Sequence, residues 1–225
     1  MFNINGVRKP LKIWQQLVFF ILGISFNAVG NGITVATNMG SAPWTASAAN
    51  LSNAFGLSIG VFLFIYGLLA ASLAAILIGH LDIRKFFANM FFVVSFSLII
   101  NEVSHVFIGL GFMNLPLGAR IIIDILAIGS VAIGVSINSR VQLIMHPLDD
   151  LVVITRFKYF KGSAIVAQGI NFAIPMIISL TVWLVTHEIM AVNIGTLVAL
   201  FGQGAIIGWG DKHVFSKLVH RRTEF

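Results

Sequence analysis

The sequence predicts an all-α, polytopic membrane protein with six transmembrane helices, and three observations support this prediction. The chain is 58% hydrophobic and only 10% charged, whereas about 25% of the residues in a typical soluble domain are charged. It contains six apolar stretches of roughly 20 residues, the length that crosses about 30 Å of hydrocarbon. Its basic residues are concentrated between alternate stretches. Because the spans use most of the 225 residues, residues 1–225 are predicted to form a single membrane domain.

The first predicted span, residues 13–36, follows three basic residues and so resembles a secretory signal. The hydrophobic region of such a signal is usually about 7 to 15 residues long. The apolar run that starts at Ile13 is longer, so it is predicted to be retained. The other predicted spans cover residues 59–79, 86–108, 117–139, 163–186 and 191–210.

The distribution of Lys and Arg predicts the orientation. With a cytoplasmic N-terminus, the outer side holds only Arg120, and the cytoplasmic side holds the other 13 of the 14 basic residues. These are Arg8, Lys9, Lys12, Arg84, Lys85, Arg140, Arg156, Lys158, Lys161, Lys212, Lys217, Arg221 and Arg222. This asymmetry follows the positive-inside rule. It predicts a bacterial cytoplasmic (inner) membrane protein with both termini cytoplasmic.

The net charge of +6 is therefore expected to face anionic lipids at the cytoplasmic surface, and no nucleic-acid partner is predicted. The tail, residues 213–225, is basic with interleaved apolar residues. That pattern predicts a short interfacial helix on the cytoplasmic side.

Two connections differ from the others. Residues 38–58 are uncharged and rich in small residues, and residues 142–162 hold an acidic pair. Each contains a Pro, Pro43 or Pro147, where a helix could begin, because Pro is well suited to the first helical turn. Each connection is therefore predicted to contain a Pro-started broken or re-entrant segment.

The chain also shows an internal repeat with an offset of 104 residues. This offset places Pro43 on Pro147 and Gly30 on Gly134. Repeat 1 covers about residues 13–110 and repeat 2 about residues 117–212. Because each repeat has three spans, the two repeats are inverted in the membrane, an architecture whose substrate sites lie near the bilayer midplane.

Three short motifs carry a family resemblance. Residues 40–44 (GSAPW), 56–60 (GLSIG) and 147–149 (PLD) resemble the YczE/YyaS/YitT group of bacterial six-span membrane proteins. The resemblance implies a permease-like build without an established activity. Members commonly have an acidic residue two positions after the first Pro, where this chain has Thr45, whereas the second-half counterpart, Asp149, is present.

The start of the second Pro segment is one candidate site. His146, Pro147 and Asp149 could bind a cation, a solute or a proton within the membrane, where a carboxylate costs about 2.5–3.5 kcal/mol. Alternatively, the acids only stabilise a helix N-terminus at the surface. Asp150 is expected to pair with Arg156 or Lys158.

The first Pro segment is the second candidate site. A helix that starts near Ser41 and Pro43 would present its N–H groups to an anion, with Asn38 and Trp44 beside it. The alternative is an amphipathic surface helix that Trp44 anchors at the membrane interface.

Polar residues within the spans form a third group of candidates. Asn27 and Asn31 share a helix face, as do Gln168 and Asn171, and Gln203 lies in the middle of the last span. They could line a polar binding cavity. Interhelical hydrogen bonds, worth about 0.6 kcal/mol each, explain them equally simply.

Two acids, Glu102 and Asp124, lie within apolar spans toward the outer side. They are candidates for proton or ion coupling, together with Asp149. The alternative is structural pairing of Asp124 with Arg120, four residues earlier, and of Glu102 with His105 or Arg120.

No enzyme signature is present: the sequence lacks a metalloprotease, serine-hydrolase or nucleotide-binding motif. It has no Cys, and neither a cofactor nor a metal site is predicted. The expected function is alternating-access transport of a small solute of unidentified nature. The alternatives are a substrate-binding membrane subunit of a larger uptake complex, or a non-transporting scaffold or regulator bound to a protein partner.

Overall fold

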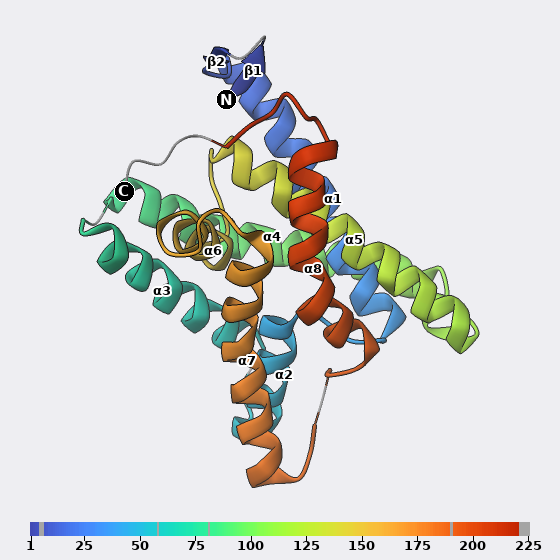
Figure 1. Ribbon diagram of the computed structural model, residues 1–225. Coiled ribbons are helices and arrows are strands. Elements are labelled where there is room, and N and C mark those ends of the chain that lie inside the picture. Colours follow the sequence, from blue (N-terminus) through green and yellow to red (C-terminus); the bar gives the residue numbers. More distant parts are fainter. Residues whose placement is uncertain (5–6, 58, 81, 190, 221–225) are drawn as a thin grey trace.

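The computed structural model describes residues 1–4, 7–57, 59–80, 82–189 and 191–220. Helices dominate, as predicted (Figure 1). They are α1 (Ile13–Thr37), α2 (Pro43–Phe55), α3 (Ile59–Ile78), α4 (Ile83–Gly109), the short 3-10 helix η1 (Phe112–Asn114), α5 (Leu117–Val141), α6 (Pro147–Lys158), α7 (Ala164–Thr186) and α8 (Ile194–His213). Ser58, Arg221 and Arg222, which belong to predicted segments, lie outside the described residues.

Five helices, α1, α3, α4, α5 and α7, are long and apolar enough to cross a membrane. They coincide with the first five predicted spans to within three residues at each end. The sixth predicted span corresponds to α8, which has 20 residues but is not among these five. The chain therefore has the build of a multi-pass membrane protein.

The distribution of side chains on the helices also suits a membrane. Large apolar side chains point away from the molecule: Phe91, Ile76 and Phe201 are 73–77% exposed. By contrast, amides such as Gln168 and Gln203 are buried inside. This pattern is expected where lipid, rather than water, surrounds the helices.

The N-terminal hairpin and the segment that follows α8 meet at one end of the molecule (Figure 1). An antiparallel hairpin, β1 (Phe2–Ile4) and β2 (Val7–Lys9), precedes α1, and Phe2 forms an isolated β-bridge with Leu218. Leu218 is fully buried against Leu11 and Ile137. The prediction of an interfacial helix is therefore wrong for residues 214–220, because their apolar side chains pack against α5 and the hairpin.

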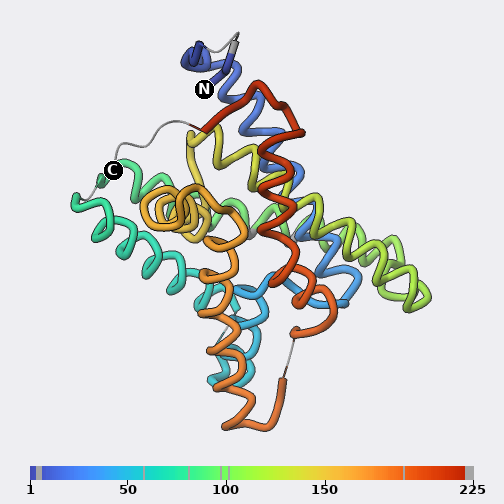
Figure 2. Tube along the Cα trace, viewed as in Figure 1, coloured from blue at the N-terminus to red at the C-terminus, as the bar shows by residue number. Residues whose placement is uncertain are grey.

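The centre of the fold is the crossing of α1 and α5, which lie side by side (Figure 2). Gly30 and Gly134 allow this close approach. A Cβ on Gly30 would lie 2.6 Å from the Ala127 carbonyl oxygen, and a Cβ on Gly134 would lie 2.6 Å from the Gly23 carbonyl oxygen. Small residues of this kind let membrane helices pack backbone to backbone.

The other helices pack around this crossing. α4 contacts α1, and α8 contacts α5. α2 packs on α3 and α7, and α6 packs on the same two helices. With 13 and 12 residues, α2 and α6 are about 18–20 Å long and too short to span a bilayer.

Candidate functional site

Both Pro-started helices follow a sharp break in the chain. Asn38 (φ 50°) follows the last residue of α1 and Gln142 (φ 52°) follows the last residue of α5, each in the left-handed conformation. Pro43 and Pro147 then occupy the first turns of α2 and α6. The predicted helix starts are thus confirmed, and both Pro side chains are buried.

The first turns of α2 and α6 meet at the middle of α3. Ala48 of α2 and Leu148 of α6 belong to one apolar cluster with Tyr66 and Ala70 of α3. Ser47 and Tyr66 share a hydrogen bond of 2.7 Å between their hydroxyl oxygens. The two predicted candidate segments are therefore neighbours on the same helix, although 104 residues separate their prolines.

At the start of α6, the side chains have distinct roles. His146 is the N-cap, because its Nδ1 accepts a hydrogen bond of 3.3 Å from the Leu148 N–H. Burial lowers the pKa of His146 to about 4, so the imidazole is neutral and suited to accept this bond. The predicted partners of Asp150 were wrong. Its carboxylate pairs with Lys85 of α4 at 2.7 Å.

The Lys85–Asp150 pair lies on the wall of a cavity of about 250 Å³ between α3, α4 and α6. Asn89, which is buried, also lines it and lies 3.5 Å from Asp150 through its amide nitrogen. The α3 side is made of small side chains, Ala71, Ala74 and Ala75. This cavity combines a cation, an anion and an amide, and its volume suits a small polar molecule.

Asp149 points to a separate and much smaller cavity of about 10 Å³, enclosed by α5, α6, α7 and α8. Gln168 lines the same cavity, and its Oε1 is buried with no hydrogen-bond partner within the described part of the chain. Burial, assisted by the charge of Asp150, raises the pKa of Asp149 to about 7. The structure therefore brings together two predicted site residues, in a space that suits one water molecule.

The first Pro segment contributes differently. Trp44 makes an edge-to-face contact with Tyr66 at 4.9 Å between ring centroids, so it packs in the core instead of anchoring a surface helix. The Ser41 carbonyl accepts a bond of 2.8 Å from the Thr196 hydroxyl. Asn38 is exposed, and its carbonyl accepts a bond from Arg120. The first Pro segment is thus linked to α3, α5 and α8, and Asn38, Ser41 and Trp44 do not line either cavity around α6.

The amides predicted within the spans act mainly as structural links. Asn31 donates to the Asn27 side chain at 2.6 Å, so these residues share a face as predicted. Asn171 donates to the Ala167 carbonyl at 2.8 Å and to the Thr155 hydroxyl of α6 at 3.3 Å. Gln203 is buried in α8 but does not line the cavities around α6. The five amides do not converge on one cavity.

The two predicted coupling acids, Glu102 and Asp124, lie in different surroundings. Glu102 is exposed on α4, whereas Asp124 is 1% exposed and accepts a hydrogen bond of 2.7 Å from Thr37. The predicted ion pair with Arg120 is not formed. Arg120 instead donates to the backbone carbonyl of Thr37 at 2.7 Å.

An ionic network that the sequence did not predict lies at the basic end of the molecule. Asp211 pairs with Arg156 at 2.7 Å, with His220 at 3.0 Å and with Arg140 at 3.6 Å, and it accepts a bond of 2.7 Å from Ser136. The one signal for this network in the sequence was Asp211 itself, an acid that lies among basic residues in a chain with few acids.

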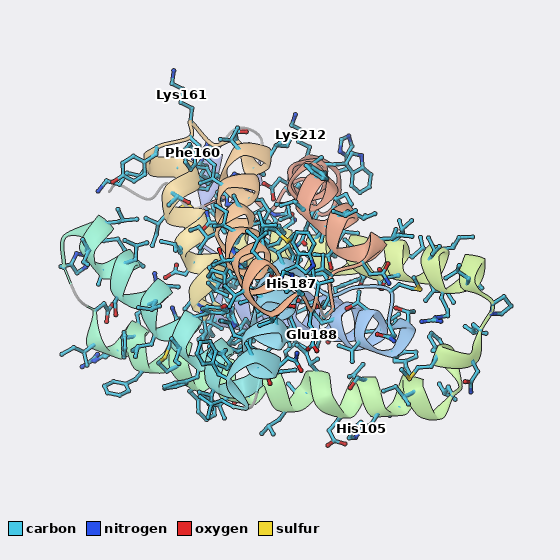
Figure 3. All side chains as sticks on the ribbon, turned by 90° about the horizontal axis from the view of Figure 1, so that it is seen from below. His105, Phe160, Lys161, His187, Glu188 and Lys212 are labelled. Atoms are coloured by element: carbon cyan, nitrogen blue, oxygen red, sulfur yellow. The ribbon has the colours of Figure 1, made fainter. Side chains whose placement is uncertain are left out.

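In Figure 3, Lys161 and Lys212 project on one side of the molecule, and His105 lies on the opposite side. Lys212 is near the end of α8, and the chain that follows α8 bonds to the N-terminal hairpin through the Lys217 carbonyl and the Asn3 N–H. We call the end of the molecule with Lys161, Lys212 and the hairpin the basic face. Lys85, Asp150 and the 250 Å³ cavity lie where α3 ends and α4 begins, at the basic-face ends of these helices.

Comparisons with known proteins give a family but no activity. No curated protein and no solved structure matches the chain. Residues 14–212, which run from the second residue of α1 to the last but one of α8, match a family of unknown function. The chain therefore belongs to the family of unknown function designated DUF6198.

Proposed function

We propose that the protein transports a small polar solute across the bacterial cytoplasmic membrane, with six spans, two inverted repeats and a cytoplasmic basic face. One observation carries the proposal: each major contact between two helices has a counterpart between the helices that lie 104 residues away in sequence. α1 with α4 corresponds to α5 with α8, and α2 with α7 corresponds to α6 with α3. An inverted pair of this kind supports alternating access, because the two halves can exchange conformations.

The crossing of α1 and α5 supports the same exchange at the level of single residues. Gly30 faces Ala127, and Gly134 faces Gly23. These two contacts are equivalent in the two repeats, because Gly134 lies 104 residues after Gly30 and Ala127 lies 104 residues after Gly23. The Ser130 hydroxyl also donates a hydrogen bond of 2.8 Å to the Phe26 carbonyl, and these two residues are 104 positions apart in the sequence. A crossing on glycine backbones gives a pivot with few side chains to repack.

The 250 Å³ cavity supports a binding role. Its wall offers the Lys85 ammonium, the Asp150 carboxylate and the Asn89 amide, so a solute with both donor and acceptor groups would be matched. Lys85 is 45% exposed, which keeps it within reach of a solute arriving from water. The resemblance of three motifs to the permease-like YczE/YyaS/YitT group supports the same assignment.

The absence of Cys from the sequence allows a direct test of this cavity. Ala75 lines the cavity, and Ile76, its neighbour on α3, is 74% exposed on the lipid-facing side. In membrane vesicles, a water-soluble, membrane-impermeant maleimide should label Ala75→Cys from the cytoplasmic side but not Ile76→Cys. Labelling of both positions, or of neither, would argue against an aqueous cavity here.

The solute is identified next, first by a binding screen and then with the Ala75→Cys variant. The purified protein is screened for thermal stabilisation by a panel of metabolites, since a ligand that binds only the folded state raises its stability. A transported solute should stabilise the wild type, protect Ala75→Cys from labelling and enter liposomes that contain the protein. A protein that binds no solute, but co-purifies with one reproducible partner, would instead be a scaffold or regulator.

A further inference from the structure

A second site lies away from both cavities, where α1 ends and α5 and α8 begin. Asp124 of α5 is the only acid at this junction within the described residues, and it is 1% exposed. We propose that Asp124 binds a proton taken up from the face opposite the basic face, and that this proton holds the junction closed. The proposal does not depend on the solute or on the cavity at Lys85.

The hydrogen bonds of Asp124 are incomplete. Its Oδ1 accepts a bond of 2.7 Å from the Thr37 hydroxyl. Its Oδ2 is buried and has no hydrogen-bond partner in the described part of the chain. An ionised carboxylate usually accepts several bonds, so this environment suits a neutral carboxylic acid better than an anion.

No counter-ion compensates the carboxylate. The nearest cation in sequence, Arg120, donates to the carbonyls of Thr37 at 2.7 Å and Asn38 at 3.3 Å. Its guanidinium thus caps the C-terminal end of α1, where the helix dipole is negative. Among the described residues, no Lys, Arg or His lies within ion-pair distance of Asp124.

The close packing at Gly195 favours a proton over a metal ion. A Cβ on Gly195 would overlap Oδ2 of Asp124, so the backbone of α8 already occupies the space beside this oxygen. The neighbouring Met39 carbonyl is bonded to the Gly195 N–H at 2.9 Å. A metal ion needs several free oxygen ligands around it, whereas a proton needs no cavity.

The groups that surround Asp124 do not compete for this proton. The end of α1 presents Thr37 and the start of α8 presents Gly195 and Thr196, and none of them titrates. On α5 the nearest titratable group is Arg120. The acids and His residues on nearby segments are exposed: Glu102 and His105 on α4, and His187 and Glu188 before α8.

Release of the proton would weaken the junction. An unpaired carboxylate within a membrane-embedded helix is unfavourable, and hydration would relieve this cost. Water can reach Oδ2 only if α8 moves away from the end of α1. That movement breaks the bond between Gly195 and Met39 and the bond from Thr196 to the Ser41 carbonyl.

The test is infrared difference spectroscopy of the purified full-length protein during a pH titration. The wild type should show a carbonyl-stretch band of protonated carboxylic acids that is weaker in Asp124→Asn, in which Asp149 can still contribute to the band. The control, Glu102→Gln, removes an exposed acid and should leave the band unchanged. A band of the same size in the wild type and in Asp124→Asn would overturn the proposal.

A second variant keeps the acid and covers the case in which Asp124→Asn does not fold. Thr37→Val removes the hydroxyl that bonds to Oδ1 and preserves the side-chain shape. The ionised form loses a donor, so the band should persist to higher pH than in the wild type. An unchanged titration in Thr37→Val would also contradict the proposal.

Discussion

The two ends of α5 bury opposite charges in different ways. Arg140, at the basic face, is 1% exposed, and its guanidinium bonds to the Val214 carbonyl at 2.8 Å and the Leu218 carbonyl at 3.0 Å. Asp211 adds a carboxylate at 3.6 Å. Asp124, at the other end of the helix, is equally buried but has one hydrogen bond, from a neutral hydroxyl.

This difference separates a structural charge from a titratable one. A buried charge with a full set of partners is held in one geometry, and removal of a partner leaves it uncompensated. A buried acid without a counter-ion is stable only as the neutral form. The Arg140 end of α5 is therefore held by a full set of charge partners, whereas the Asp124 end is the one that we propose responds to protons.

The largest expected effect is at the basic face. Asp211→Asn removes the carboxylate that Arg140, Arg156 and His220 share, and we expect a loss of stability of about 3–5 kcal/mol. Thermal unfolding of the purified protein measures it. The control is Glu188→Gln, at an exposed acid, which should change the stability by less than about 0.5 kcal/mol.

The crossing of α1 and α5 provides the next prediction. A methyl group on Gly30 of α1 or on Gly134 of α5 would meet backbone atoms at 2.6 Å, so Gly30→Ala and Gly134→Ala should each cost about 1–3 kcal/mol. Gly129→Ala, on the same helix as Gly134, is the matched control, because its Cβ would meet nothing within 4 Å. Similar losses for Gly30→Ala and Gly134→Ala would agree with equivalent repeats, and a large effect at one position alone would contradict them.

Asp149 at the small cavity should give an intermediate, pH-dependent effect. Its pKa is raised to about 7 by burial and by Asp150, so the folded state favours the protonated form. The stabilisation from this proton is present at low pH and is lost as the pH rises through about 7. The melting temperature of the wild type should therefore fall across this range, and that of Asp149→Asn should fall less. Parallel melting curves would show that Asp149 does not titrate there.

The smallest expected effect comes from the same substitution at the Asp124 end. Because a protonated acid and an amide are both neutral and similar in shape, Asp124→Asn should cost less than about 1.5 kcal/mol, well below Asp211→Asn. Unfolding of both variants at one pH gives the comparison directly. Equal losses at both ends would remove the distinction between the structural and the titratable charge.

Periodicity and composition were sufficient for the helices. The five long apolar helices were predicted to within three residues, because the thickness of hydrocarbon sets a minimum length that composition reveals. Pro43 and Pro147 also marked the starts of α2 and α6, because Pro fits the first turn of a helix. The prediction for the tail was wrong, because its pattern suited an interfacial helix whereas Leu218 is buried against α5.

Partners of polar side chains could not be predicted in the same way. Asp150 pairs with Lys85, which is 65 residues away in sequence, and Asp124 bonds to Thr37, which is 87 residues away. The pairings expected from proximity in sequence, of Asp150 with Arg156 or Lys158 and of Asp124 with Arg120, were both wrong. Spacing along one helix limits which groups can meet, but it carries no information about the helix that packs against them.

Local composition was enough to predict where the chain is apolar, approximately where its helices begin and end, and which loops are basic. Which charges are compensated depends instead on how the helices pack. Arg140 and Asp124 lie on one helix, and the difference between them comes from the segments that pack on its two ends, the chain after α8 at one and the end of α1 at the other. A buried charge is stabilised by the groups within about 3–4 Å of it, and those groups are brought there by the fold.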